Sequence, residues 1–361
     1  MTSSLQRIAG RVLIAGIPAR ALPAPLAVLA RAGALGGIIL FKRNLGSLAE
    51  NAATIAALHD AWAEGDVPLI AIDQEGGRVA RLGAPLLALP PMRVLGTIDD
   101  PDLTRRAARV LGVQLRALGI GVDFAPVLDV DTNPDNPVIG DRAFGRDPDT
   151  VIRHALAFAD GLAEAGVIAC GKHFPGHGDT DLDSHLALPR IAHDRARLDA
   201  VELAPFRAAR SRLPTIMTAH VIFDAIDASV PATLSRAVIE GVLRKELGYD
   251  GLIVSDDLEM KAVADRWGIA GSAVLAIEAG CDALLVCSDT ARVVEAHAAL
   301  VARAEQDGAF AARLMEAAAR VDALPRVGRP LDDVEASIAA AGGAAIEAEI
   351  ASRARSGRAE S

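Results

Sequence analysis

The chain has 361 residues, of which 51% are hydrophobic, and its formal net charge is −10 at pH 7. This length and apolar content are enough to bury a substantial core in one large α/β domain or two smaller ones. Only 3% of the residues are aromatic and the charge balance is acidic, which argues against a nucleic-acid-binding surface, because such surfaces need clustered Lys and Arg and exposed rings.

Eight apolar, β-branched runs recur along the chain and alternate with helix-like segments. The segments 103–118, 151–165 and 235–246 have helical apolar spacing and are long enough to serve as right-handed crossovers. This alternation predicts a single-domain (β/α)₈ TIM barrel over residues 1–330, in preference to an open doubly wound sheet. The eight expected strands are residues 12–17, 36–41, 68–73, 122–130, 167–173, 215–223, 251–257 and 283–288.

Polar residues stand where several of these strands end. The carboxyl ends of the strands build the active site of a TIM barrel, so residues far apart in the sequence are expected to meet there. The residues in question are Lys42, Arg43, Asn44, Asp73, Gln74, Glu75, Asp129, Asp131, Lys172, His173, His220, Asp256 and Asp257.

The two ends of the chain differ from the barrel. Near the N-terminus, Arg20, Arg31 and three prolines interrupt the apolar sequence, so we interpret it as mature fold rather than a secretory signal. No apolar run reaches the roughly 18 residues of a membrane-spanning helix. Residues 331–361 are rich in alanine with scattered charged residues, which predicts a C-terminal helix and then a frayed tail with solvated arginines.

The three cysteines, Cys170, Cys281 and Cys287, each lie in or beside an apolar strand-like segment. We expect them to be buried free thiols in a reducing compartment. Together with the lack of a signal or membrane segment, this predicts a cytoplasmic protein without a membrane partner.

Residues 172–185 form the most informative stretch, with three histidines and three aspartates in a glycine-broken run directly after a strand. Within it, the Asp183 carboxylate can accept a proton from His185, orient the ring and stabilise the imidazolium. Taken alone, this tripeptide favours a surface turn with a chance histidine, because an Asp two residues before a His is a weak signal. His173, His177 and Asp179 are plausible zinc ligands, but their spacing is not that of a metalloprotease helix, and we expect no metal.

Asp256 closes the strand 251–257, a position that holds a carboxylate rigidly and aims it into the mouth of a barrel. Hydrolysis of an acetal uses a nucleophile or base on one side of the anomeric carbon and an acid on the other. Successive strand side chains point to opposite sides, so only one of Asp256 and Asp257 is expected to face the ligand. The alternative role is to cap the following helix, which suits Asp257 better than Asp256.

Three motifs together resemble glycoside hydrolase family 3 β-N-acetylglucosaminidases, in particular the bacterial cytoplasmic type that recycles cell wall. The resemblance covers roughly residues 10 to 325, and the motifs occur in the family's order. They are residues 73–81 (DQEGGRVAR), residues 172–178 (KHFPGHG) with 183–185 (DSH), and residues 255–258 (SDDL).

The resemblance implies retention of configuration through a covalent glycosyl-enzyme on Asp256, with His185 as acid/base assisted by Asp183. The implied substrate is a peptidoglycan-derived muropeptide of the GlcNAc-1,6-anhydroMurNAc type, from which the non-reducing N-acetylglucosamine is removed. No cofactor is implied, and the protein is expected to be a monomer. The residues expected around the sugar are Asp73, Arg81, Arg142, Lys172 and His173.

Several alternatives stay open at this point. Arg81 could pair structurally with Glu75, and Arg142 could be a surface arginine. Among enzymes, a family 3 β-glucosidase or an N-acetylglucosaminide phosphorylase has the same catalytic frame. A non-catalytic sugar-binding barrel would bind without turnover.

Overall fold

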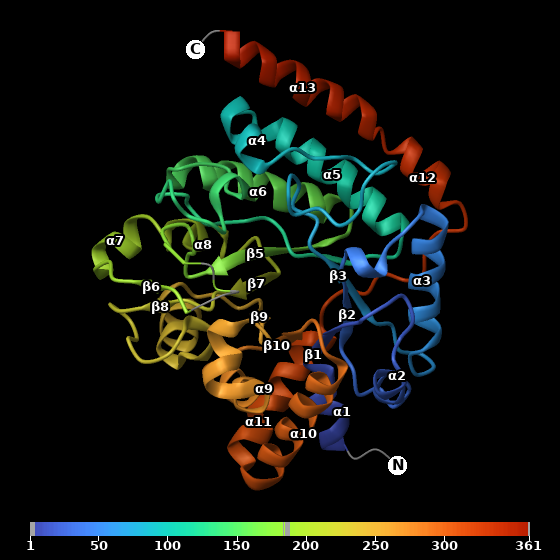
Figure 1. The fold of residues 1–361 in the computed structure, drawn as a ribbon, viewed down its shortest axis with the longest axis vertical. Helices are drawn as coiled ribbons and strands as arrows, with labels where there is room; N and C mark the ends of the chain where they lie inside the picture. Colours follow the sequence, from blue (N-terminus) through green and yellow to red (C-terminus); the bar gives the residue numbers. More distant parts are fainter. Residues whose placement is uncertain (1–3, 183, 185–187, 360–361) are drawn as a thin grey trace.

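A computed structural model of the protein describes residues 4–182, 184 and 188–359. Eight parallel strands close into a barrel in the order β1-β10-β9-β7-β5-β4-β3-β2, with helices around it (Figure 1). The predicted TIM barrel is therefore confirmed. Its strands are β1 Leu13–Gly16, β2 Gly37–Leu40, β3 Leu69–Ile72, β4 Val122–Asp123, β5 Ile168–Phe174, β7 Thr215–Thr218, β9 Leu252–Asp257 and β10 Ala283–Val286.

The helices form the outer layer. Two shorter strands, β6 Arg190–Ile191 and β8 Ile222–Phe223, pair with each other outside the barrel. Three 3₁₀ turns are η1 Lys42–Asn44, η2 Gly140–Arg142 and η3 Ala232–Leu234. The α-helices are α1 Ser4–Arg11, α2 Ala24–Arg31, α3 Leu48–Asp60, α4 Met92–Ile98, α5 Pro101–Ala117, α6 Pro148–Glu164, α7 Arg195–Ala200, α8 Ala204–Ala209, α9 Lys261–Ala279, α10 Thr290–Gln306, α11 Gly308–Asp322, α12 Val334–Ala340 and α13 Gly343–Ala359.

The crossover helices α5 and α6 show how local sequence fixes the outer layer. Each is preceded by an aspartate whose side chain accepts a hydrogen bond from a backbone N–H of the first turn. A proline follows the aspartate, and because proline has no N–H, it leaves no donor unpaired at the first helical position. A Cβ added to Gly161 of α6 would lie 2.2 Å from the Arg105 carbonyl oxygen of α5. Glycine therefore allows the two helices to pack closely.

Three elements differ from the expected ranges. The strand expected at 122–130 ends at Asp123, because Pro126 has no N–H for the ladder, and only Val127 bridges back to Lys172. The strand expected at 215–223 divides into β7 in the barrel and β8 outside it. The helix expected at 235–246 is the π-helix η4 Ala237–Glu246.

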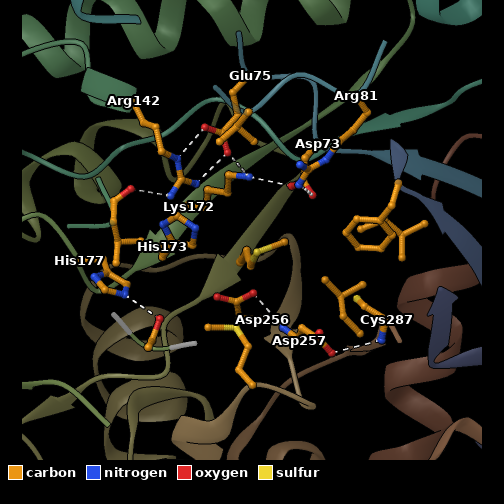
Figure 2. A pocket seen from close by; sticks show the side chains of 18 residues that line it. Asp73, Glu75, Arg81, Arg142, Lys172, His173, His177, Asp256, Asp257 and Cys287 are labelled. Carbon is orange, nitrogen blue, oxygen red and sulfur yellow. Dashed lines mark hydrogen bonds and ion pairs between the residues drawn. The ribbon is translucent and has the colours of Figure 1, made fainter. Parts of the chain in front are cut away.

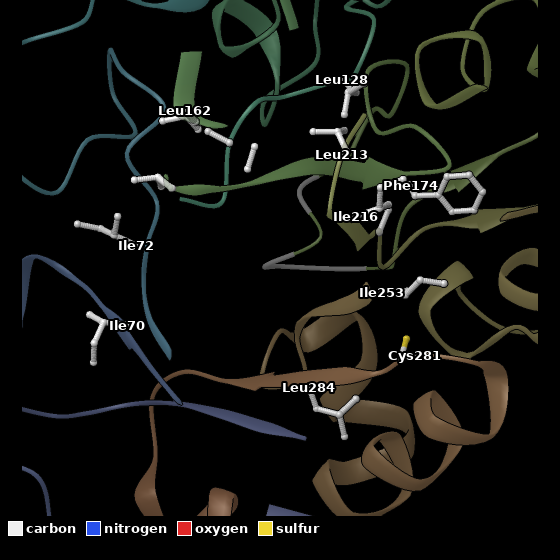
Figure 3. Close-up of a cluster of buried hydrophobic side chains, with 14 of the residues drawn as sticks. Ile70, Ile72, Leu128, Leu162, Phe174, Leu213, Ile216, Ile253, Cys281 and Leu284 are labelled. Atoms are coloured by element: carbon white, nitrogen blue, oxygen red, sulfur yellow. The ribbon is translucent and has the colours of Figure 1, made fainter. Parts of the chain in front are cut away.

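The core has two parts because strand side chains alternate. Along β9, Leu252 and Val254 point into the barrel, whereas Ile253 joins the larger cluster between strands and helices. Part of this outer cluster, including Ile70, Ile72, Ile216 and Leu284, is drawn in Figure 3. All three cysteines are buried and free, as predicted.

The sequence predicted a helix and a frayed tail in the C-terminal segment, and the structure has two helices there, α12 and α13, the second of which extends to Ala359. Figure 1 shows α13 lying along α4 and α5. Ile346 and Ile350 join the main core, and Arg106 of α5 binds both carboxylate oxygens of Glu349 at 2.7 and 2.8 Å. These contacts hold the segment against the barrel. In the described part of the chain, none of the helices combines the length and apolarity needed to cross a membrane.

The seam between β1 and β10 supplies a test of barrel packing. A Cβ added to Gly16, the last residue of β1, would lie 1.9 Å from the Cys287 carbonyl oxygen. Gly16→Ala is expected to lower the free energy of unfolding by about 1–3 kcal/mol, because β1 and the segment directly after β10 must move apart. Urea denaturation measures this. Gly83→Ala, where the added Cβ meets no atom within 4 Å, is the matched control, and equal stability of the two variants would contradict the prediction.

Candidate active site

A cavity of about 180 Å³ opens at the carboxyl ends of the barrel strands (Figure 2). Six of the site residues expected from the sequence line it, and they come from four segments of the chain: Asp73 and Arg81, Arg142, Lys172 and His173, and Asp256. Asp183 and His185 lie outside the described residues, but Ser184 lines the cavity. The lining residues are Ile39, Phe41, Asp73, Glu75, Val79, Arg81, Val138, Arg142, Lys172, His173, His177, Ser184, Met217, Asp256, Asp257, Met260, Leu285 and Cys287.

Lys172 of β5 is the centre of one wall. Its Nζ lies 2.9 Å from Asp73 Oδ1, directly after β3, and 2.5 Å from Glu75 Oε1. Figure 2 shows this ammonium between the two carboxylates. The Lys172 side chain is only 3% exposed, so its charge needs both partners.

Two arginines complete this ionic cluster. Arg81 Nη2 donates to Asp73 Oδ2 at 3.1 Å, and Arg142 of η2 donates to both oxygens of Glu75 at 2.8 and 2.9 Å. The suggested Arg81–Glu75 pair is therefore wrong, since the chain turns at Gly76 and Gly77 and returns Arg81 beside Asp73. Arg142 is not a surface residue either, because its side chain is 11% exposed.

The cluster sets the protonation of its members. Burial raises the pKa of Glu75, but Arg142 and Lys172 outweigh it and hold that pKa below its ordinary value. Burial lowers the pKa of Lys172, but Asp73 and Glu75 raise it further, above the ordinary value. The wall thus presents fixed charges, which bind hydroxyl groups more strongly than neutral partners do.

Asp129 supports the second part of the site from beneath. It is fully buried, and its Oδ2 lies 2.7 Å from His173 Nδ1 while its Oδ1 accepts the His177 N–H at 2.7 Å. Burial raises the pKa of Asp129, but the charge of His173 outweighs this and lowers it. The ionised Asp129 accepts a hydrogen bond from His173 Nδ1–H, so Nε2 is the ring nitrogen left for a ligand.

His177 extends this network to the segment after β5. Thr180 Oγ1 donates to the His177 carbonyl oxygen and lies 2.7 Å from His177 Nδ1, which assigns the proton to Nδ1. His177 Nε2 then accepts from Ser184 Oγ at 3.0 Å. Burial and the nearby His173 lower the pKa of His177 to about 4, so the ring is neutral near pH 7.

The residues considered for zinc are engaged in other contacts. Asp179 contacts Thr132 Oγ1 at 2.6 Å and His193 Nε2 at 2.5 Å, away from His173 and His177. Within residues 4–182, 184 and 188–359, no group of three His, Cys, Asp or Glu side chains is arranged to hold a metal ion.

The opposite wall carries Asp256 and Asp257, both from β9 (Figure 2). The expectation that only one of them faces the cavity is wrong. Ala283 of β10 pairs with Val254 and Leu285 pairs with Asp257, so two steps on β10 match three on β9. This one-residue bulge interrupts the strand alternation and brings both carboxyl groups to the cavity.

The alternative role considered for Asp257, capping of α9, is not seen, since the N-cap of that helix is Met260. Asp257 Oδ1 instead accepts the Glu259 N–H at 3.1 Å and the Cys287 N–H at 3.2 Å. Burial, followed by the charges of Glu259 and Asp256, raises the pKa of Asp257 to about 7. The cavity therefore has the ionic cluster on one side and the carboxyl pair of Asp256 and Asp257 on the other.

Other strand-end residues have structural roles. Asn44 Nδ2 donates to the carbonyl oxygens of Ile17 and Ala19, and Asp131 binds Arg93 at 2.8 Å. The support that Asp129 gives to His173 was not predicted, although its place after β4 was a signal. The apolar wall of Met217, Met260 and Leu285 was not predicted either, because local sequence gives no signal for it.

Comparisons with known proteins agree with this geometry. Residues 25–324 match the glycosyl hydrolase family 3 N-terminal domain. A β-hexosaminidase from Neisseria gonorrhoeae (strain ATCC 700825 / FA 1090) is 43% identical over 263 residues, which are 71% of this chain and 72% of the relative.

Two solved structures are similar over nearly the whole chain. The family 3 β-N-acetylglucosaminidase from Paenibacillus sp. str. FPU-7 has a TM-score of 0.83 and 41% identity, and the match covers 94% of this chain and 68% of that one. NagZ from Neisseria gonorrhoeae, in complex with N-trifluoroacetyl-D-glucosamine, has a TM-score of 0.80 and 35% identity. The match covers 96% of this chain and 98% of NagZ.

Asp123, at the end of β4, offers a test of the electrostatics beneath the site. Its Oδ1 accepts the Gln74 N–H at 2.9 Å, and its buried Oδ2 has no hydrogen-bond partner in the described structure. Burial raises the pKa of Asp123 to about 7. Between about pH 4 and pH 7 the unfolded chain therefore loses a proton that the folded chain keeps, and stability falls as pH rises.

Asp123→Asn removes this ionisation. The free energy of unfolding of the variant, relative to the original protein, should rise from pH 4 to pH 7 by up to about 1.4 kcal/mol per pH unit. Urea denaturation across this range measures the difference, and any packing cost of the new amide appears as a constant offset. A difference that does not change with pH would show that Asp123 titrates alike in both states.

Proposed function

The chain belongs to glycosyl hydrolase family 3 and is a β-N-acetylhexosaminidase, and we propose that it is a retaining exo-β-N-acetylglucosaminidase of the cell-wall-recycling type. Its proposed substrate is a peptidoglycan-derived muropeptide ending in GlcNAc-1,6-anhydroMurNAc. The main support is the cavity in which Asp256 faces the ionic cluster of Lys172, Asp73 and Glu75.

The size of the cavity supports action on a terminal sugar. Its volume, about 180 Å³, is below the roughly 300–1,000 Å³ of pockets for drug-sized ligands, which suits a single sugar unit. The ionic cluster can then bind the hydroxyls of the non-reducing ring through Asp73, Arg81, Arg142, Lys172 and His173. The complex of the related NagZ with N-trifluoroacetyl-D-glucosamine supports an N-acylated ring here.

In the proposed mechanism, Asp256 attacks the anomeric carbon while the glycosidic oxygen leaves with a proton from His185. This step forms the bond from carbon to the Asp256 carboxylate and breaks the bond to the aglycone. His185 then takes a proton from water, whose oxygen displaces Asp256 with a second inversion and so retains the configuration. Asp183 orients His185 and stabilises its charged form.

Two observations support these assignments. Asp256 Oδ1 accepts the N–H of Asp257 at 2.8 Å, which fixes the carboxylate at the end of a barrel strand. Ser184, which stands between Asp183 and His185 in the sequence, lines the same cavity and binds His177. We also propose that the enzyme works in the cytoplasm as a monomer and without a cofactor.

The first test is hydrolysis of an aryl β-N-acetylglucosaminide beside the matching aryl β-glucoside. The acetamido substrate should be preferred. Removal of an acid/base group costs about 10²–10⁴-fold, so His185→Ala should lose activity in that range, and Asp256→Ala should lose more because no glycosyl-enzyme can form. Exposed Asp332→Ala is the control. Preference for the glucoside would overturn the substrate assignment, and faster turnover with phosphate would indicate a phosphorylase.

The second test concerns the natural substrate. Release of N-acetylglucosamine from GlcNAc-1,6-anhydroMurNAc peptide and from chitobiose is compared by kcat/KM. We expect the muropeptide to be the better substrate, with β-configured sugar as the first product in NMR spectra. Higher kcat/KM on chitobiose would refute the muropeptide assignment, and an α-configured first product would refute retention.

A further inference from the structure

The Asp257 carboxyl group lines the cavity but has no role in the proposed mechanism. We propose that Asp257 binds the sugar, through a hydrogen bond from its Oδ2 to a substituent beside the anomeric carbon. This inference rests on the proposed function, because it needs the ring to be held with that carbon at Asp256.

The position of Asp257 follows from the bulge in β9. In a regular strand its side chain would point away from the cavity, but the extra residue between Val254 and Asp257 turns both carboxyl groups into it. A bulge next to a site is a frequent means of aiming a side chain. The fold therefore places a second carboxyl beside Asp256 rather than behind the strand.

The carboxyl group is fixed through only one of its oxygens. Oδ1 accepts two backbone N–H groups, from Glu259 and Cys287. The backbone of Asp257 is held as well, since His220 Nε2 donates to its carbonyl oxygen at 2.9 Å and His220 Nδ1 contacts Thr233 Oγ1 at 2.8 Å. These contacts account for a structural role without using Oδ2.

Oδ2 has no hydrogen bond within residues 4–182, 184 and 188–359, although Asp257 lines the cavity. Its neighbours along this wall are Met260, Leu285 and Cys287, which offer it no ionic partner. Oδ2 is not sealed from solvent, so a bound sugar that displaces this solvent must supply a hydrogen bond in its place. Its pKa, raised to about 7, lets it donate or accept a hydrogen bond near neutral pH.

The chemistry of the ring limits what Oδ2 can reach. Asp256 and Asp257 both line the cavity, and the charge of Asp256 contributes to the raised pKa of Asp257, so the two carboxyl groups are neighbours and Oδ2 must serve a group close to the anomeric carbon. On a glucosamine ring, that carbon is flanked by the carbon bearing the acetamido group and by the ring oxygen, beyond which lies the hydroxymethyl group. Asp257 therefore binds either the acetamido N–H or the C6 hydroxyl.

The experiment pairs changes in the enzyme with changes in the substrate. The aryl β-N-acetylglucosaminide, its 6-deoxy analogue and the aryl β-glucoside are each tested with the original enzyme, Asp257→Asn and Asp257→Ala. Glu259→Gln is the matched control, since Glu259 holds the same turn through the N–H groups of Ser288 and Asp289 but does not line the cavity.

We expect Asp257→Ala to lose about 10- to 100-fold in kcat/KM on the parent substrate, as for a hydrogen bond to a charged group. On the analogue that lacks the bound substituent, the variant and the original enzyme should differ by less than about threefold. A deficit that vanishes with the 6-deoxy sugar assigns the C6 hydroxyl, and one that vanishes with the glucoside assigns the acetamido group.

Equal loss on all three substrates, or no loss on any, would overturn the proposal and leave Asp257 a structural residue. Asp257→Asn keeps an oxygen for the two N–H groups and remains testable should Asp257→Ala fold poorly. Calorimetric binding of N-acetylglucosamine to Asp256→Ala and to Asp256→Ala/Asp257→Ala gives a readout free of turnover. If the original enzyme cleaves none of the substrates, the proposed function fails, whereas equal affinity of these two variants for the sugar refutes the role of Asp257 alone.

Discussion

The site depends on one buried ammonium group. Lys172 binds Asp73 after β3 and Glu75 in the loop that follows, and Glu75 in turn binds Arg142 on η2. Three segments of the chain that are remote in sequence are thereby held in one arrangement before any ligand arrives. Removing one partner from a buried pair typically costs about 3–5 kcal/mol, because the other charge stays behind without compensation. The same contacts that preorganise this wall of the cavity therefore also stabilise the loops.

The two walls are built by different means. The ionic wall relies on ion pairs between side chains of β5, η2 and the segment after β3, whereas the carboxyl pair opposite is fixed by backbone geometry, through the bulge in β9 and the N–H groups of Glu259 and Cys287. A reacting carboxylate gains from such rigidity, since small displacements slow a reaction considerably. Asp129 links His173 in the cavity to the segment after β5, because it accepts hydrogen bonds from both His173 and His177.

The sequence predicted the barrel and the residues that gather at its mouth, since strand and helix periodicity repeat eight times and the motifs follow strand ends. The family resemblance, drawn from three motifs, is confirmed by the match over residues 25–324. The predictions that were wrong depend on local backbone features and long-range contacts that the periodicity of the sequence does not encode. The short β4 results from Pro126, the second cavity-facing carboxyl from a bulge, and the Arg81–Asp73 pair from a turn at two glycines. The position of α13 depends on contacts between residues more than 200 apart, such as Arg106 and Glu349.

The apolar wall of Met217, Met260 and Leu285 has a consequence for how the enzyme could evolve. These side chains line the cavity but take no part in its ion pairs, and hydrophobic exchanges of similar volume usually cost less than about 1.5 kcal/mol. Substitutions in the ionic wall, by contrast, disturb several loops at once. New preferences for the acyl group or the aglycone are therefore most accessible through this wall, and mutant libraries aimed at altered specificity would best begin there.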